Sequence, residues 1–303
     1  MINKPSGVYV PVLTPFTKDL HVDQPRFAAF CKWIVSQGAG LAVFGTNSEA
    51  ASLSTAEKRV ALDALLAAGI PNSVLMPGTG ACSITDAIEL TAHAVRAGCA
   101  GTLTLPPWYY KGVSDQGLAD YYSRIIDSVA SDQLQMLLYH IPQLTGVPIS
   151  LNLIEMLIKR YPKTVVGIKD SSGDWNNCEA MLKAFPGFAI FPASESFLIK
   201  AMPLGAAGCI SATANIQPGP IANHVKRWKE PGVDDRHSGV DAVRQIMQKT
   251  NMIPALKYVT AVHGGDAEWA RVRPPLETMV SHTGDPIVRS LQAVGFAMPG
   301  WGS

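Results

Sequence analysis

Short runs of uniformly apolar residues alternate along the chain with longer segments in which apolar residues recur every three or four positions. Uniformly apolar runs are typical of parallel strands covered on both faces, and the longer spacing is typical of amphipathic helices. The predicted strands are Tyr9–Leu13, Gly40–Phe44, Ser73–Met76, Gly101–Leu105, Gln135–Tyr139, Val165–Lys169, Ala189–Phe191 and Gly208–Ser211. The predicted helices are Gln24–Gln37, Thr55–Ala68, Ile84–Ala97, Asp115–Val129, Leu151–Arg160, Asn176–Ala184 and Phe197–Pro203.

Capping residues support these helices: Ser54 and Glu57 have the spacing of a capping box, and Ser150 precedes a helix. Strands that are each followed by a crossover predict an α/β fold, a (β/α)8 TIM barrel, over residues 1–230. The rival fold, a doubly wound sheet, would carry a GxGxxG motif after an early strand, and the sequence has none there. A C-terminal helical subdomain, residues 231–303, is expected to pack on the barrel. Its predicted helices are Val240–Lys249, Pro254–Val262 and Asp285–Ala297.

The composition narrows the class of protein. The 303 residues include 25 Lys and Arg against 24 Asp and Glu, so the formal net charge of +1 attracts neither nucleic acid nor an anionic membrane. No apolar run approaches the roughly 18 residues that a membrane span needs. The five cysteines form no CxxC pair, and the seven histidines form no HxH or HExxH motif, so no metal site is expected. The first residues, Met1–Gly7, lack the regions of a secretory signal, which predicts a cytoplasmic protein.

Candidate chemistry lies where the strands end, because the active sites of TIM barrels form at the C-terminal ends of their strands. Lys169 ends an apolar run, where loss of water favours the neutral amine. Such an amine attacks a ketone and forms a Schiff base, an electron sink that needs no cofactor. The alternative is a surface lysine paired with Asp170. Tyr139 ends the adjacent strand, about 5 Å away, where a phenol could relay protons; taken singly, its default interpretation is a core tyrosine whose hydroxyl is satisfied by backbone.

The loop after the second strand carries Thr46 and Asn47. Their hydroxyl and amide groups, together with the N–H groups of a turn before a helix, suit a carboxylate. The alternative interpretation is ordinary helix capping. His140 follows Tyr139 and should point to the opposite side of its strand, so it is interpreted as structural.

Four segments, in this order and at strand ends, resemble the dihydrodipicolinate synthase / N-acetylneuraminate lyase superfamily of Schiff-base aldolases, dehydratases and condensing enzymes. These segments are Gly7–Phe16, Gly45–Glu49, Tyr139–Gly146 and Gly167–Asp174. The resemblance spans residues 7–300 and implies that Lys169 is the Schiff-base lysine. It implies that Tyr139 relays protons and that Thr46 supplies the hydroxyl of the second-strand loop. It also implies that no cofactor is needed beyond the covalent imine.

The resemblance further implies a homotetramer, a dimer of dimers, in which a tyrosine from a neighbouring subunit completes the proton relay. Ungapped matching gives this role to Tyr109, with Tyr110 as the alternative. Backbone groups near Ala193 and Ile210 fall where the family holds its substrate.

Three positions bear on the choice of substrate. Leu144 stands where the synthase branch has an arginine that binds the aldehyde's carboxylate, and leucine cannot replace a bidentate guanidinium. Leu144 resembles the sialic acid lyase branch, whereas Asn47 resembles the 4-hydroxy-2-oxoglutarate aldolase branch. Glu195 lies where the lyases place an acid that contacts sugar hydroxyls; the alternative is a carboxylate that complements a helix N-terminus.

We therefore expect a Schiff-base lyase, an aldolase or dehydratase that acts on a hydroxylated 2-oxo acid and releases or uses pyruvate. Candidate substrates are of the 4-hydroxy-2-oxoglutarate or 2-oxo-3-deoxy sugar acid type. One alternative is a 4-hydroxy-tetrahydrodipicolinate synthase that condenses pyruvate with aspartate semialdehyde. A more remote alternative is a non-catalytic barrel that binds a small molecule.

Overall fold

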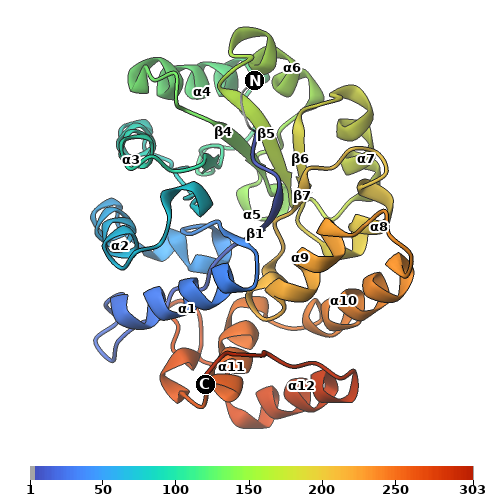
Figure 1. The fold of residues 1–303 in the computed structure, drawn as a ribbon. Coiled ribbons are helices and arrows are strands. Elements are labelled where there is room, and N and C mark those ends of the chain that lie inside the picture. Colours follow the sequence, from blue (N-terminus) through green and yellow to red (C-terminus); the bar gives the residue numbers. More distant parts are fainter. Residues whose placement is uncertain (1–3, 303) are drawn as a thin grey trace.

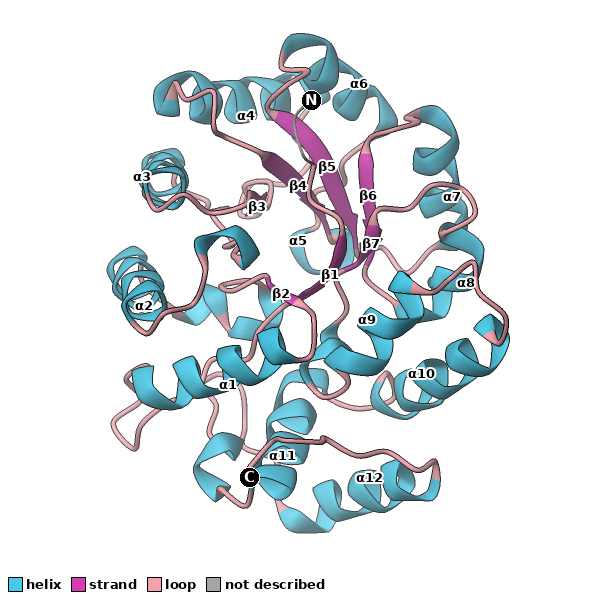
Figure 2. Cartoon of the chain, viewed as in Figure 1, coloured by secondary structure: helices cyan, strands magenta, loops and turns pink. Residues whose placement is uncertain are grey.

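Short parallel strands occupy the centre of the molecule and helices surround them (Figure 1; Figure 2). The structure, a computed structural model, describes residues 4–302; residues 1–3, part of the segment predicted to lack a secretory signal, lie outside that range. The strands are β1 (Gly7–Val10), β2 (Gly40–Leu41), β3 (Thr102–Thr104), β4 (Met136–His140), β5 (Val165–Asp170), β6 (Ala189–Pro192) and β7 (Gly208–Cys209). The helices are α1 (Gln24–Ser36), α2 (Thr55–Ala67), α3 (Ile84–Arg96), α4 (Asp115–Val129), α5 (Pro142–Thr145), α6 (Leu151–Arg160), α7 (Trp175–Ala184), α8 (Leu198–Ala201), α9 (Pro218–Lys226), α10 (Val233–Met247), α11 (Met252–Gly264) and α12 (Ser281–Ala293).

The strands close into a ring. One parallel sheet has the order β2-β1-β7 and the other has the order β3-β4-β5-β6. The segment 75–78 joins the two sheets on one side, where Met76 N donates to the carbonyl of Leu41 at 2.8 Å and the Pro77 carbonyl accepts from Leu103 N at 2.9 Å. The ring closes on the other side where Ala207 and Ile210, the residues that flank β7, donate backbone hydrogen bonds to β6. This ring of eight parallel segments is the predicted TIM barrel.

The predicted third strand, Ser73–Met76, is the weakest part of the ring and is not a regular strand. Its first residues form a tight helical turn, Asn72–Val74, and Pro77 has no N–H to give to a neighbouring strand. Close backbone contact replaces the regular ladder at this point. A Cβ atom on Gly78 would lie 2.1 Å from the carbonyl oxygen of Phe44, so only glycine fits there.

The helix boundaries follow the capping signals. Ser54 and Glu57 form the predicted capping box, with each side chain accepting from the other's backbone N–H. Two helices were not predicted, α5 and α9, and each starts at a proline. Proline interrupts a helix pattern read from sequence, yet it suits the first helical turn, where its missing N–H has no partner to lose.

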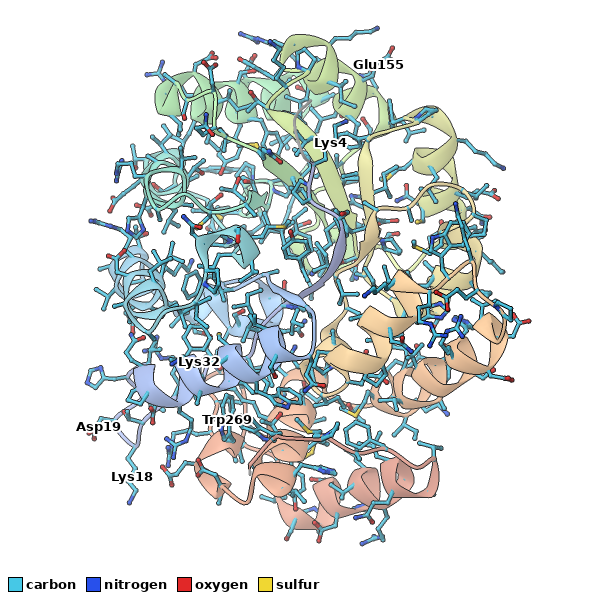
Figure 3. The ribbon with its side chains drawn as sticks, in the orientation of Figure 1. Lys4, Lys18, Asp19, Lys32, Glu155 and Trp269 are labelled. Carbon is cyan, nitrogen blue, oxygen red and sulfur yellow. The ribbon has the colours of Figure 1, made fainter. Side chains whose placement is uncertain are left out.

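The C-terminal helices pack on the barrel's helices. α10 contacts α8 and α9, and α11 contacts α10 and α12. Charged side chains such as Lys18 and Glu155 point outward, whereas Trp269 is buried near α1, its ring 4.7 Å from that of Phe30 (Figure 3). α10 begins well before its predicted start at Val240, since acidic residues in its first turn favour a helix N-terminus. The division of the chain at residue 230 stays a prediction.

Successive strand residues face opposite sides of the barrel wall. Tyr139 and Phe191 belong to a buried cluster inside the barrel, whereas Ile168 belongs to the larger cluster between strands and helices. Lys169 follows Ile168 and pairs in register with Phe191, so its side chain enters the barrel interior.

Candidate active site

Adjacent strands place an amine against a phenol at the C-terminal mouth of the barrel. Tyr139 and Lys169 are register partners in the parallel pair β4–β5. Lys169 Nζ donates a hydrogen bond to Tyr139 Oη at 3.1 Å and lies 4.2 Å from the centre of the tyrosine ring. Both side chains are 2% exposed, so Lys169 is not a surface lysine. Asp170 is engaged elsewhere, accepting from the Ser172 N–H and the Asn177 side chain.

The hydroxyl of Tyr139 lies between two further groups. It shares a hydrogen bond of 3.0 Å with Thr46 Oγ1. Burial by itself would raise the pKa of Tyr139, but the charge of Lys169 and hydrogen bonds with Thr46, Lys169 and Ser171 outweigh burial and lower it. A phenol with a lowered pKa is a proton acceptor and donor closer to neutral pH than free tyrosine. Amine, phenol and threonine thus form a short chain along which protons can move.

The second-strand loop is shaped by its own backbone contacts. Thr46–Ser48 forms a single tight helical turn after Gly45. Ser48 Oγ donates to the carbonyl of Val12 and accepts from Gly45 N, while Thr14 Oγ1 donates to the carbonyl of Ser48 at 2.8 Å. These bonds tie the loop to the segment after β1. They keep the Thr46 hydroxyl within hydrogen-bond distance of Tyr139 Oη.

Behind this loop lies a buried ion pair. Glu49 has a left-handed backbone (φ 56°), and its carboxylate pairs with Lys257 on α11, both side chains being wholly buried. The backbone N–H of Arg273 donates to the other carboxylate oxygen at 2.8 Å. The pair fastens the C-terminal helices to the loop that carries Thr46.

Lys169 lines a cavity of about 390 Å³. Six of the other predicted site residues line it with Lys169: Thr46, Asn47, Tyr139, Leu144, Ala193 and Ile210. A second, mainly apolar cavity of about 310 Å³ lies on the other side of Thr46 and Tyr139, and Trp108 lines it. Leu144 lines both cavities and is exposed at their mouth. The structure therefore brings together the predicted amine, phenol, hydroxyl and amide groups in the lining of one cavity.

Two predicted residues lie away from this cavity. Tyr109 is 76% exposed, packs edge-on against Tyr110, and lines neither cavity. Its role in a neighbouring subunit stays a prediction. Glu195 is fully buried outside the cavity lining, and its carboxylate accepts hydrogen bonds from Ser211, Thr213 and Gln217.

His140 is structural, as predicted. Its Nδ1 accepts from the N–H of Ile149 at 3.0 Å, on the far side of the strand from Tyr139. Burial lowers the pKa of His140, against the opposing charge of Asp170. The imidazole is therefore kept neutral and orders the segment after α5.

Sequence reasoning missed the part of the cavity that the C-terminal helices supply. Arg244 on α10 and Asn251 to Ile253 at the start of α11 line the cavity with Lys169. No local signal distinguished them, because they reach the site only through tertiary packing. Within residues 4–302, no cluster of three or more His, Cys, Asp or Glu side chains has the arrangement of a metal site. Nor does any helix in that range have the length and apolarity to cross a bilayer.

Comparison with known proteins agrees with the geometry. Residues 4–294 match the model of the dihydrodipicolinate synthetase family. A curated relative, an uncharacterized DapA-like lyase of Chloroflexus aurantiacus, is 33% identical over 257 residues, covering 84% of this chain and 85% of the relative. The chain belongs to the dihydrodipicolinate synthetase family, whose members are lyases.

Solved structures show the same fold. Dihydrodipicolinate synthase from Agrobacterium tumefaciens superposes with a TM-score of 0.89 at 30% identity, covering 96% of this chain and 99% of that one. YagE, a prophage protein of the dihydrodipicolinic acid synthase family from Escherichia coli K12, was solved in complex with pyruvate. It superposes with a TM-score of 0.87 at 26% identity over 96% of this chain and 99% of that one. The predicted family and barrel are confirmed.

Proposed function

We propose that this member of the dihydrodipicolinate synthetase family is a Schiff-base lyase that cleaves hydroxylated 2-oxo acids, with Lys169 as the nucleophile. One observation carries the proposal: the buried Nζ of Lys169 lies 3.1 Å from Tyr139 Oη, which lies 3.0 Å from Thr46 Oγ1, and all three residues line the same cavity. A binding protein would not need an amine, a phenol and a hydroxyl in hydrogen-bonded series. The pyruvate found in the related YagE structure supports a 2-oxo acid as ligand.

In the first half of the reaction the Lys169 amine attacks the C2 ketone and forms a carbinolamine. Loss of water from the carbinolamine gives an iminium ion. Each step moves a proton between nitrogen and oxygen, and Tyr139 Oη is within hydrogen-bond reach of that nitrogen. Thr46 and Asn47 border the same cavity and hold the C1 carboxylate by hydroxyl, amide and backbone N–H groups.

In the second half a 4-hydroxy-2-oxo acid breaks its C3–C4 bond. The electron pair of that bond flows into the iminium and leaves an enamine, while the C4 hydroxyl loses its proton to Tyr139 and becomes the carbonyl of an aldehyde. Protonation of the enamine at C3 and hydrolysis of the imine by water release pyruvate and return Lys169 to its free form. Atoms and charges balance without any oxidant or metal.

Condensation of pyruvate with aspartate semialdehyde is the second candidate. The name of the Agrobacterium relative, 30% identical in sequence, favours it. Leu144 disfavours it, because an apolar side chain stands where the synthase branch has the arginine that binds the carboxylate of the aldehyde.

We further propose a cytoplasmic homotetramer, a dimer of dimers, in which Tyr109 of one subunit approaches the cavity of another.

The test is release of pyruvate from 4-hydroxy-2-oxoglutarate and from 2-oxo-3-deoxygluconate, followed with lactate dehydrogenase and NADH. Wild type should turn over at least one of them, and Lys169→Arg should lose about a thousandfold or more of that activity, because an arginine cannot form the imine. Lys200→Arg, an exposed lysine on α8, is the matched control. Equal rates in Lys169→Arg and wild type would refute the proposal. Formation of the condensation product from pyruvate and aspartate semialdehyde, without cleavage, would favour the second candidate.

A further inference from the structure

The cavity that contains Lys169 holds a second cation that the reaction at the imine does not use. Among the residues that line it in the described part of the chain, the charged side chains are Lys169 and Arg244, with no aspartate or glutamate. In the proposed function Lys169 becomes the imine, and Thr46 and Asn47 hold the C1 carboxylate. Arg244, on α10, is left as a cation facing the remainder of the substrate.

The guanidinium of Arg244 has few partners of its own. It offers five N–H donors. Nη1 reaches Ser211 Oγ at 3.4 Å, a long hydrogen bond, and lies 3.9 Å from Glu195 Oε2, the outer limit of an ion pair. Nε is buried without a hydrogen-bond partner in residues 4–302, and the side chain is 17% exposed. Donors buried in this way destabilise the protein unless a ligand accepts from them.

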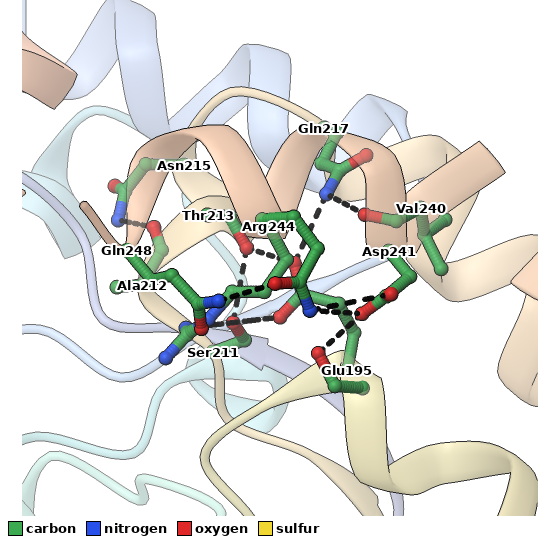
Figure 4. A network of polar contacts seen from close by, with 12 residues as sticks. Glu195, Ser211, Ala212, Thr213, Asn215, Gln217, Val240, Asp241, Arg244 and Gln248 are labelled. Carbon is green, nitrogen blue, oxygen red and sulfur yellow. Dashed lines mark hydrogen bonds and ion pairs between the residues drawn. The ribbon is translucent and has the colours of Figure 1, made fainter. Parts of the chain in front are cut away.

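Glu195 lies 3.9 Å from Arg244 Nη1, close enough to attract the guanidinium but too far to accept a hydrogen bond from it. Its carboxylate already accepts hydrogen bonds from Ser211, from Thr213 and, at 3.0 Å, from Gln217 Nε2 (Figure 4). These three donors engage both carboxylate oxygens, and Glu195 is not among the residues that line the cavity. Glu195 is therefore a positioning residue for Arg244, which lines the cavity with its Nε free of any partner in the described residues.

The same side of the cavity has a second source of positive potential. Asn251, Met252 and Ile253 line it, so the N-terminus of the 13-residue helix α11 faces the cavity. The Asn251 side chain makes no capping hydrogen bond to the helix. The first backbone N–H groups of a helix carry partial positive charge and favour an anion.

We infer that Arg244 binds a second carboxylate, at the end of the substrate remote from the ketone. The substrate class is therefore a 2-oxo diacid, and the aldehyde it releases carries a carboxylate, as when 4-hydroxy-2-oxoglutarate gives pyruvate and glyoxylate. The inference rests on the proposed function for the orientation of the ketone on Lys169. The binding of a second anion by Arg244 does not depend on imine formation and is tested separately.

The first test measures binding of unreactive acids by isothermal titration calorimetry. Glutarate has a carboxylate at each end of a five-carbon chain, and pentanoate has one carboxylate on a chain of the same length. Wild type should bind glutarate about 10- to 100-fold more tightly than pentanoate, the effect of one charge-assisted hydrogen-bonded contact, and Arg244→Gln should abolish that difference. Arg289→Gln, an exposed arginine on α12, should keep it. Equal affinity of wild type for the two acids, or a preference that survives in Arg244→Gln, would overturn the inference.

The second test compares kcat/KM for 4-hydroxy-2-oxoglutarate, whose far end is anionic, with kcat/KM for 2-oxo-3-deoxygluconate, whose far end is neutral. Arg244→Gln should lower the ratio of the two by about 10- to 100-fold, and Arg244→Lys should restore part of it because the charge returns without the planar fork. A fall of both values by the same factor would mean that Arg244 only supports the fold. If no 2-oxo acid reacts at Lys169 but glutarate still requires Arg244, the proposed function fails and the anion site stands.

Discussion

Lys169 Nζ lies 3.1 Å from Tyr139 Oη because the two residues stand directly opposite each other in the parallel ladder of β4 and β5. Their proximity depends on backbone register and not on a mobile loop. The neighbours of each residue along its strand face the outside of the barrel, so a shift of either strand by one residue would remove its functional group from the interior. The amine and the phenol are thus held together by the paired backbones of two adjacent strands.

The phenol should be required for rapid proton transfer. Tyr139→Phe keeps the ring that packs inside the barrel and removes only the hydroxyl. We expect kcat to fall by about 10²- to 10⁴-fold, the usual effect of losing a general acid or base, with the thermal unfolding temperature nearly unchanged. Tyr258→Phe, which removes a surface hydroxyl bonded to Asp285, is the control. Steady-state kinetics that leave Tyr139→Phe within threefold of wild type would contradict a relay through this hydroxyl.

The pH dependence should report the environment of Tyr139. Burial raises its pKa, but Lys169 and the hydrogen bonds from Thr46, Lys169 and Ser171 lower it overall. Thr46→Val removes one bond that stabilises the phenolate, so the pKa of Tyr139 should rise. The limb of the kcat/KM profile that climbs with pH should then move to higher pH. An unchanged or lower position of that limb in Thr46→Val would show that another group controls it.

The repeating strand–helix pattern, the capping boxes and the strand-end lysine and tyrosine could all be predicted from sequence, because each depends on neighbours close in the chain. Register partners could be inferred as well, since consecutive strands pair in a barrel. The place of Ser73–Met76 in the ring could also be predicted, but its irregular form could not, because that form depends on close contact between Gly78 and the carbonyl of Phe44.

The sequence likewise contained no sign that the C-terminal helices line the cavity with Lys169. Arg244 lies about 75 residues beyond Lys169 in sequence and reaches the cavity only because α10 packs on α8 and α9. The partners of Glu195 were hidden as well, because Ser211 and Thr213, which hydrogen-bond to its carboxylate, come from the end of the next strand. Such contacts are set by tertiary packing, which a single sequence does not display.

The buried pair between Glu49 and Lys257 should matter for stability. Burial lowers the pKa of Lys257 to about 8 even though Glu49 opposes the shift. Glu49→Gln leaves the ammonium buried without its counter-charge, and the free energy of unfolding should fall by about 3–5 kcal/mol. Urea denaturation measures this change directly.

Two controls separate this effect from charge removal in general. Lys159→Ala breaks an exposed pair with Glu155 and should change the free energy of unfolding by less than about 0.5 kcal/mol. The double variant Glu49→Gln, Lys257→Met removes both charges and should recover part of the loss. If Glu49→Gln is no worse than Lys159→Ala, the pair does not fasten the C-terminal helices to the site loop.

A relay completed by a neighbouring subunit predicts that activity depends on assembly. Tyr109 and Tyr110 are both largely exposed, and their rings pack edge-on against each other. We expect Tyr109→Phe to lower kcat by about 10-fold or more and Tyr110→Phe to have a smaller effect. Specific activity should fall on dilution to concentrations at which sizing detects single chains. Full activity of dissociated chains would exclude the intersubunit tyrosine.

The central claim is that Lys169 forms a covalent imine with a 2-oxo acid, and reduction by borohydride in the presence of pyruvate tests it most directly. Intact-mass spectrometry should then find one pyruvate-derived addition per chain, and peptide mapping should assign it to Lys169. The Lys169→Arg variant should take up none, whereas Lys200→Arg should label like wild type. Absence of label on Lys169 with pyruvate, with 4-hydroxy-2-oxoglutarate and with 2-oxo-3-deoxygluconate alike would contradict the account.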